Sequence, residues 1–345
     1  MTTIEDTWLE IPDAPPIDGL RFRRSRGDDA DYEAIAALIV AANRQDEILW
    51  VPTGRNLREE VESSPGLDLR RDVVLAEIDG RVVGDSAVER VMRDGVATYE
   101  MAGHVLPDVR RRGLGTALFR ENLRRATERA AEEPEGQVSV ARIHTEETEA
   151  GHRTLLAQHG FEPIRWFFLM RRSTAGEISE APLPDGIELR SVTADQHRAI
   201  FEAEREAFLD HWAAREQTEE DFRLTYGRDE LDTDLWVVAW DGDEVAGVVQ
   251  NWIWAEENAQ LGVARGWLEH ISVRRPWRRR GLARAITAEA LRRLALAGMT
   301  DAMLGVDADS PTGALGLYEG LGFEVEQRSQ VYRRPLPANP DLRRV

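Results

Sequence analysis

The stretch that decides the fold is VRRPWRRRGLA at residues 273–283, which has a counterpart, VLPDVRRRGLG, at residues 105–115. In both, three arginines and a glycine stand between a strand-like run and an amphipathic helix pattern. Cations at a helix N-terminus oppose the macrodipole, so two such loops indicate a compensating anion. Glycine lets backbone N–H groups approach a phosphate closely, and arginine adds bidentate donors. One copy also fits a solvated basic turn or a nucleic-acid contact, but the repetition favours phosphate binding.

The two loops belong to an internal repeat, because Arg278 follows Arg110 by 168 residues, about one domain length. Residues 72–91 and 234–253 each read as two strands joined by an Asp-Gly turn. The remaining elements also recur. They are expected as strands at 20–23 and 187–190, strands at 98–105 and 267–273, helices at 114–131 and 282–297, strands at 137–143 and 302–306, and closing strands at 166–170 and 330–332.

The repeat predicts a mixed α/β (α+β) fold of two tandem domains. The first is expected at residues 20–172 and the second at residues 187–335. Residues 173–186 carry glycine and proline without apolar periodicity and are interpreted as a linker. Residues 1–19 and 336–345 are expected to be surface tails.

The composition limits the classes of function. The 345 residues are 42% hydrophobic and 31% charged, which is typical of a globular protein, and no apolar run is long enough to span a bilayer. No signal sequence is evident, so a cytoplasmic monomer or homodimer is expected. The chain has no cysteine, and its seven histidines lack metal-ligand spacing, so no metal is expected. A net charge of −19 argues against nucleic-acid and membrane partners.

The loops resemble the coenzyme A loop of the GNAT acetyltransferase superfamily, and VDA at 306–308 and LYEGLGF at 317–323 resemble its later strand and tyrosine helix. The resemblance covers most of residues 20–172 and 187–334. Two such domains in one chain resemble mycothiol synthase and its relatives. The resemblance implies two mixed β-sheets flanked by helices, each splayed open between its fourth and fifth strands, where the pantetheine arm of acetyl-CoA pairs with the fourth strand.

The resemblance also implies which residues bind acetyl-CoA, which would serve as a co-substrate. In the second domain these are Ile271, Ser272, Val273, Arg278, Arg279, Arg280, Gly281, Leu282, Ala283 and Arg284. In the first domain they are His104, Val105, Arg110, Arg111, Arg112, Gly113, Leu114, Gly115 and Thr116. Two alternatives stay open for the first domain: it binds acetyl-CoA without turnover, or it completes the substrate wall of the second.

Acetyl transfer from a thioester to an amine requires a proton donor for the departing thiolate. The resemblance implies that Tyr318 has this role. In the first half the aligned residue is Leu156, which has no proton to give. The alternative for Tyr318 is an aromatic side chain packed on the sheet.

The same reaction requires a base for the amine, and Glu269 on the fourth strand is the candidate. The residue 168 positions earlier is Met101, which predicts a catalytically silent first domain. Strand alternation predicts that Glu269 and Val273 share a face, with His270 on the other. The alternatives are that Glu269 pairs with a neighbouring arginine, or that His270 is the base.

The function expected from these features is N-acetyl transfer from acetyl-CoA to a primary amine of a small molecule, by direct attack in the second domain. One alternative is a non-catalytic acyl-CoA-binding sensor, and another is mycothiol synthase proper. Residues 202–234 are rich in acids, which fits a solvated helix face or a pocket for a cationic amine.

Overall fold

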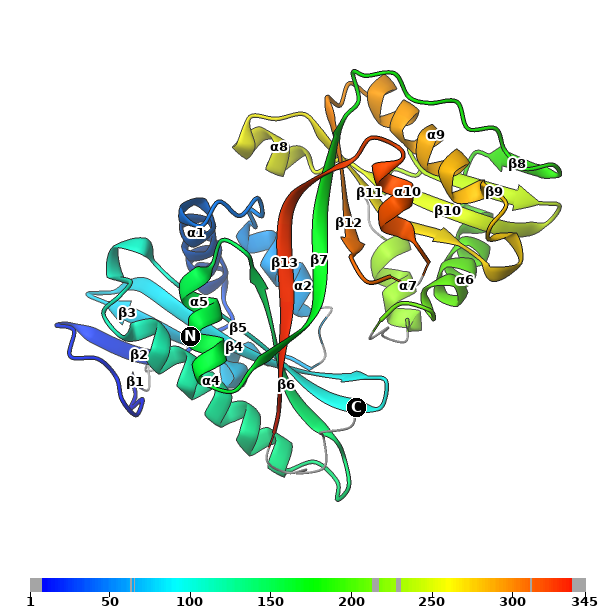
Figure 1. Ribbon diagram of the computed structural model, residues 1–345. Helices are drawn as coiled ribbons and strands as arrows, with labels where there is room; N and C mark the ends of the chain where they lie inside the picture. The colour runs from blue at the N-terminus through cyan, green and yellow to red at the C-terminus, as the bar shows by residue number, and fades with distance from the viewer. Residues whose placement is uncertain are drawn as a thin grey trace. The chain divides into compact units, whose positions relative to one another are not determined.

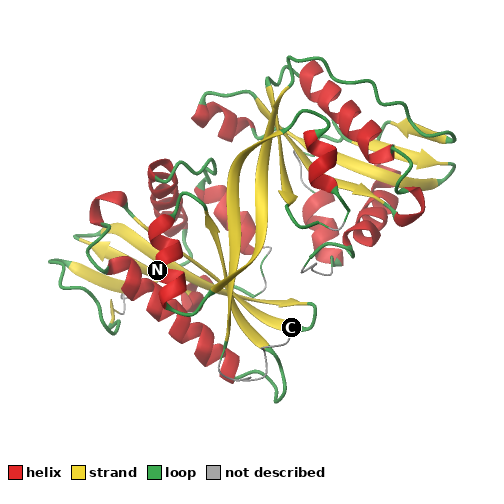
Figure 2. Cartoon of the chain, in the orientation of Figure 1, coloured by secondary structure: helices red, strands yellow, loops and turns green. Residues whose placement is uncertain are grey.

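The computed structural model describes residues 8–62, 64, 66–212, 217–227, 231–310 and 312–336 (Figure 1). The expected tails thus lie partly outside the described residues. The chain packs as two compact units: Met1–Arg165 with Ser329–Val345 form unit 1, and Trp166–Arg328 form unit 2. Both are sheets flanked by helices (Figure 2). None of the helices in the described residues is both long and apolar enough to span a bilayer.

Unit 1 is built on a mixed sheet in the order β1-β2-β3-β4-β5-β6-β13. Its neighbouring strands are antiparallel except β5 and β6. Its elements are β1 (Trp8–Leu9), β2 (Leu20–Arg24), α1 (Asp29–Gln45), α2 (Gly54–Glu62), α3 (Leu69–Asp72), β3 (Val73–Ile78), β4 (Arg81–Arg93), β5 (Val96–Val105), α4 (Leu114–Ala131), β6 (Ser139–Glu146), α5 (Ala150–Gln158) and β13 (Glu324–Pro335).

Unit 2 repeats this plan with the strand order β8-β9-β10-β11-β12-β7, in which β11 and β12 are the parallel pair. Its elements are β7 (Glu162–Ser173), β8 (Ile187–Arg190), α6 (His197–Phe208), α7 (Glu219–Tyr226), β9 (Val237–Asp241), β10 (Glu244–Trp252), α8 (Ala255–Leu261), β11 (Arg265–Val273), α9 (Leu282–Leu296), β12 (Asp301–Asp307) and α10 (Ala314–Glu319).

The last strands of the two halves are exchanged. Residues Phe167–Ser173 of β7 pair with β12, and residues Ser329–Pro335 of β13 pair with β6. The expected boundaries, 20–172 and 187–335, therefore differ from the packed units at both closing strands. Because β6 and β12 are repeat equivalents, each offers a similar edge, and the alternating pattern of a strand does not state which edge it joins.

The two faces of the unit 2 sheet are covered by different helices. Gln250 donates a hydrogen bond to Glu204 of α6, and the neighbouring Asn251 donates one to the Ala290 carbonyl of α9. Successive strand residues point to opposite faces, so α6 and α9 lie on opposite sides of β10. The α9 face carries the larger apolar cluster, including Ile286, Leu291 and Leu294.

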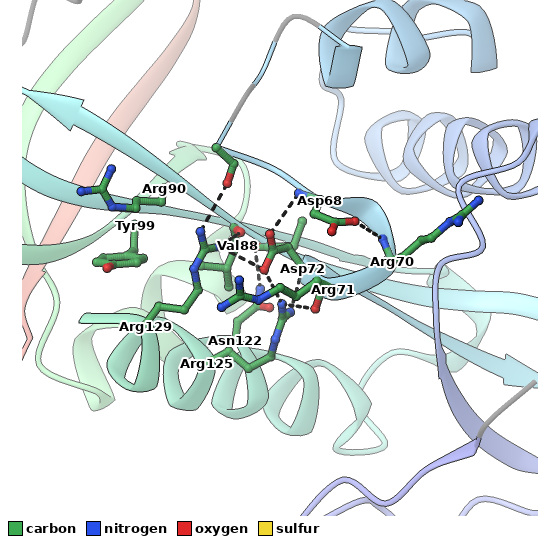
Figure 3. Close-up of polar contacts among 12 residues, drawn as sticks. Asp68, Arg70, Arg71, Asp72, Val88, Arg90, Tyr99, Asn122, Arg125 and Arg129 are labelled. Carbon is green, nitrogen blue, oxygen red and sulfur yellow. Dashed lines mark hydrogen bonds and ion pairs between the residues drawn. The ribbon is translucent and has the colours of Figure 1, made fainter. Parts of the chain in front are cut away.

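A buried charge network joins α4 of unit 1 to the segment before β3 (Figure 3). Asp72 is 2% exposed, and its Oδ1 lies 3.1 Å from Arg125 Nη2 and 3.0 Å from Arg129 Nη1. Arg125 also donates to the backbone carbonyls of Arg71 and Asp72, and Arg129 to that of Val88. Burial lowers the pKa of Arg125 to about 10 even with this carboxylate beside it.

Candidate active site

The arginine-glycine loops have the same backbone in both units. Arg279 and Gly281 have φ of 61° and 86°, and Arg111 and Gly113 have φ of 63° and 92°. Glycine adopts this left-handed conformation without strain. Gly281 and Gly113 also precede the first residues of α9 and α4, so neither helix has a side chain that caps it. The first-turn amides of each helix are therefore open to an anion.

The first arginine of each loop holds the loop to its own unit. Arg278 Nε donates to the Val273 carbonyl at 2.9 Å, and Nη1 donates to Asp210 at 2.6 Å. Arg110 donates in the same way to the Val105 carbonyl at 3.0 Å and to both oxygens of Asp46 at 2.7 Å. Because these guanidinium groups already have protein acceptors, we assign them to positioning the loop rather than to phosphate contact.

The later arginines of the unit 2 loop lie closer to solvent. Arg279 and Arg280 are exposed, and Arg280 donates to the Asp185 carbonyl at 3.3 Å. Arg284, at the start of α9, donates to the Gly320 carbonyl at 2.9 Å and so connects this helix to the end of α10. Arg279 and Arg280 therefore have the exposure that a phosphate contact requires, and Arg284 has a structural partner.

The two loops differ in what covers them. A Cβ at Gly281 would have no described atom within 4 Å, whereas one at Gly113 would lie 3.3 Å from Pro15 Cβ. The segment around Pro15 is fixed to unit 1, because Asp13 pairs with Arg120 and Ile11 packs in the core beside Leu114. The unit 2 loop is thus open at its glycine, and the unit 1 loop is covered there.

The sheet of each unit opens beside its loop. In the described chain, β11 pairs with β12 over Arg265–Trp267 only, and β5 pairs with β6 over Ala97–Glu100 only. The later residues of β11 and β5 thus have an edge to which an extended ligand can bind. In unit 1 the His104 N–H donates to Asp85 Oδ1 at 2.7 Å, and His104 Nδ1 lies 3.0 Å from the same oxygen.

A β-bulge in β11 distinguishes the open edge of unit 2. Val248 faces Ser272 and Gln250 faces Glu269, so two residues of β11 lie opposite Val249. One of them, His270, has a φ of 47°. Unit 1 has an unbroken register along β4 and β5. A bulge re-aims side chains and interrupts the ladder, and bulges are common beside active sites.

The bulge corrects two sequence expectations. Residues facing each other across a ladder share a face, so Glu269 lies on the Gln250 face, whereas Val273 lies on the opposite face with Gly247. The expectation that Glu269 and Val273 share a face was wrong, because the extra residue changes the alternation.

The extra residue also shifts the correspondence between the units. Gly247 of β10 and Gly84 of β4 are equivalent positions in the two ladders. Three residues after Gly247, Gln250 faces Glu269, and three residues after Gly84, Ala87 faces the counterpart of Glu269. That counterpart is Ala102 and not Met101. Unit 1 still has no titratable side chain at this position.

Glu269 lies on the α6 face beside other ionisable groups. Burial raises the pKa of its carboxyl, and the neighbouring His270 opposes that shift. A base with a raised pKa operates closer to neutral pH. The sequence offered Glu269 as a candidate from its place on the strand, and the structure adds the partial burial that makes it a better base.

Sequence analysis gave Glu204 of α6 no role beyond being one of the acids of residues 202–234, and in the structure it is 2% exposed. Its Oε2 accepts a hydrogen bond from Gln250 at 2.7 Å, and its Oε1 lies 3.6 Å from His270 Nδ1. The available signal was the pattern of α6, where Glu204 falls among the buried residues Ile200, Ala203 and Ala207. A carboxylate on an apolar helix face indicates a buried partner.

Tyr318 lies on the other side of the sheet from Glu269. It is 6% exposed in the cluster with Leu268 and Ile286 on the α9 side, with its ring edge-on to Phe323. Burial raises the pKa of its phenol, so the hydroxyl keeps its proton across the physiological range. In unit 1, Leu156 is fully buried. Unit 2 therefore has a carboxylate on one face and a phenol on the other.

The sequence and the fold are similar to those of known acetyltransferases. Residues 197–323 match the acetyltransferase (GNAT) family, and residues 70–163 match an acetyltransferase (GNAT) domain. The chain is 31% identical to a mycothiol acetyltransferase of Geodermatophilus obscurus over 313 residues. This alignment covers 90% of this chain and 96% of that protein.

Solved structures have the same architecture. A GCN5-related N-acetyltransferase from Sphaerobacter thermophilus has a TM-score of 0.71 at 27% identity, over 92% of this chain and 96% of that one. A tandem GNAT protein from the clavulanic acid biosynthesis pathway has the same fold, with a TM-score of 0.66 at 17% identity, over 93% and 99% of the two chains. With its repeated loops, its splayed sheets and this full-length similarity, the chain belongs to the GNAT family of acetyltransferases.

Proposed function

We propose that unit 2 transfers an acetyl group from acetyl-CoA to a primary amine of a small molecule. The observation that carries the proposal is the combination, in unit 2, of an open phosphate loop with the free β11 edge, where Glu269 and Tyr318 lie on opposite faces. An acyl group bound along this edge would have a base on one side and an acid on the other.

Acetyl-CoA supplies an activated thioester, whose C–S bond breaks as the amine nitrogen bonds to the carbonyl carbon. Glu269 accepts a proton from the ammonium form of the acceptor, which frees the nitrogen lone pair. After attack the nitrogen loses its second proton to solvent, and Tyr318 donates its hydroxyl proton to the departing sulfur and regains one from solvent. The amides at Gly281 and the first turn of α9, with Arg279 and Arg280, hold the pyrophosphate.

Unit 1 is proposed to be catalytically silent. Leu156 stands where an acid is needed, and Ala102 where a base is needed. Pro15 lies against the unit 1 loop glycine.

A second candidate acceptor is the substrate of the mycothiol acetyltransferases. The observation that favours it is the 31% identity to one of them over nearly its whole length. That acceptor belongs in any panel of amines, because its activity relative to simple amines distinguishes the two candidates.

The test is release of the coenzyme A thiol in the presence of acetyl-CoA and a panel of primary amines. The chain has no cysteine, so with an amine that carries no thiol a thiol reagent reports coenzyme A alone, and a thiol-bearing acceptor is followed by mass spectrometry of the product. We expect amine-dependent release, and a fall of about 10²-fold in kcat/KM for Glu269→Gln. Because burial raises the pKa of Glu269, kcat/KM should rise with pH through that raised value. Tight acetyl-CoA binding with no release for any amine would instead support an acyl-CoA sensor.

Gly281→Val tests the loop. A β-branched residue in the left-handed region costs about 1–3 kcal/mol, so acetyl-CoA affinity should fall by about 5- to 150-fold. The matched variant Gly113→Val introduces the same change in unit 1 and should leave turnover within about twofold of wild type, a difference of less than 0.5 kcal/mol. Calorimetry and thiol release measure the two effects. Turnover that is lost in Gly113→Val and kept in Gly281→Val would place the active centre in unit 1.

A further inference from the structure

The bulge of β11 holds His270 in an unusual conformation. Its φ of 47° is in the left-handed region, which only a few per cent of non-glycine residues adopt, histidine, asparagine and aspartate more often than others. Such conformations persist where the surroundings fix them and are concentrated at functional sites. The structurally equivalent stretch of unit 1 has a regular register and a glycine, Gly103. The conformation of His270 therefore belongs to the unit that carries Glu269.

The contacts of His270 come from α6. Its Nδ1 lies 3.6 Å from Glu204 Oε1, and its ring packs edge-on against Phe208 with 5.4 Å between centroids. The Glu204 side chain is 2% exposed, whereas the His270 side chain is 41% exposed. Glu204 Oε1 has no hydrogen-bond partner among the described residues, so the imidazole is its nearest counter-charge. A buried carboxylate requires such a cation.

Glu204 and Glu269 are both carboxylates on the α6 face, and Gln250 connects them. Gln250 faces Glu269 across the ladder and donates to Glu204 at 2.7 Å. Carboxylates that lie close together disfavour each other's ionised form, and a nearby cation favours it. His270 contacts Glu204 and is the next residue after Glu269.

We propose that His270, held at the bulge by Glu204, carries the positive charge that keeps Glu269 ionised for acetyl transfer. Both are positioning residues, and the inference rests on the proposed function of unit 2. Glu204 and Glu269 both raise the pKa of His270 against the opposing effect of burial, and His270 lowers that of Glu269. Loss of the imidazolium would raise the pKa of Glu269 further, and a protonated carboxyl cannot accept a proton from the amine.

Other ionisable groups lie around this trio. On α8, burial raises the pKa of Glu257, Trp267 and the charge of Arg265 oppose that shift, and Glu269 adds to it. Beyond α6, burial lowers the pKa of His211; Asp307 and Asp210 oppose this shift, and Arg278 and His270 add to it. On α7, burial and Glu204 raise the pKa of Tyr226, so its phenol is neutral. Among the described residues, His270 is the cation that contacts Glu204, and it is also the cation that lowers the pKa of Glu269.

The test uses the full chain and the pH dependence of kcat/KM. His270→Asn removes the imidazole, and asparagine tolerates the left-handed region. Loss of a cation within about 4–6 Å raises a carboxyl pKa by about 1–3 units. The acidic limb of the pH profile should therefore shift to higher pH by about 1–3 units. The rate at high pH should stay within about threefold of the wild-type rate. A limb that does not move, with a lower rate at all pH values, would overturn the proposal.

The double variant His270→Asn with Glu204→Gln sharpens the test. Removing the second carboxylate relieves the repulsion, so the acidic limb should move back toward the wild-type position by at least half. If His270 and Glu204 had a purely structural role, kcat/KM of the double variant would be lower than that of either single variant at every pH. His144→Asn in unit 1, an exposed histidine beside Glu146, is the matched control and should leave the profile unchanged.

NMR titration of the His270 ring tests the proposal without an acceptor. We expect the His270 pKa to fall by about one unit or more in Glu204→Gln. An unchanged titration would overturn the pairing even if acetyl transfer is intact. A shifted titration in a protein that acetylates no amine would instead refute the proposed function and leave the ion pair established.

Discussion

Tyr318→Phe is expected to slow the chemical step of acetyl transfer by about 10²–10⁴-fold, the usual contribution of a general acid. The hydroxyl is the only group removed, and the ring keeps its edge-on contact with Phe323. Burial raises the pKa of the Tyr318 phenol, so the proton is present at every working pH. Acetyl-CoA binding depends on the loop at Gly281 and should be little changed.

Single-turnover transfer at saturating acetyl-CoA measures this effect, with the dissociation constant determined separately. Tyr332→Phe is the matched control, because that buried tyrosine lies in unit 1 and donates its hydroxyl to Gln330. It should cost stability only, about 1 kcal/mol for one hydrogen bond. A chemical step within twofold of wild type in Tyr318→Phe would leave Tyr318 as a packing residue, and solvent or the acceptor amine would then supply the proton.

Asp72→Asn is expected to destabilise unit 1 by about 3–5 kcal/mol, because it leaves buried arginines without their counter-charge. Asp72 lies 3.1 Å from Arg125 and 3.0 Å from Arg129, and these arginines come from the helix that follows the unit 1 loop (Figure 3). Asparagine keeps the shape and removes the charge. Burial lowers the pKa of Arg125 to about 10 even with Asp72 present, so removal of the Asp72 charge leaves this buried cation with still less compensation.

Chemical denaturation followed by far-UV circular dichroism measures the change in the free energy of unfolding of this unit. Asp108→Asn is the matched control: its carboxylate pairs with Arg81 at 2.9 Å, but both side chains are more than half exposed. An exposed pair contributes about 0–1 kcal/mol. Equal losses in Asp72→Asn and Asp108→Asn would show that the buried network adds nothing beyond a surface ion pair.

The sequence by itself determined the local elements and the repeat. The helix expected at residues 114–131 is α4 with the same ends, and the hairpin at residues 72–91 turns at Asp79 and Gly80, both with positive φ. These features depend on periodicity, turn chemistry and helix termini, which act within a few residues. The two arginine-glycine loops could likewise be predicted from the sequence, because arginines at a helix N-terminus oppose the helix dipole and this conflict is local in the chain.

The tertiary structure decided what depends on contacts between distant residues. Equivalent edges in β6 and β12 allow either closing strand to pair with either unit, so β7 and β13 are exchanged without any mark in the sequence. The bulge at His270 changes the face of Glu269 relative to Val273, because one extra residue reverses the alternation of a strand. Whether a charged side chain binds a ligand or holds the fold depends on which acceptors packing places beside it, and Arg278 and Glu204 acquire their partners only there.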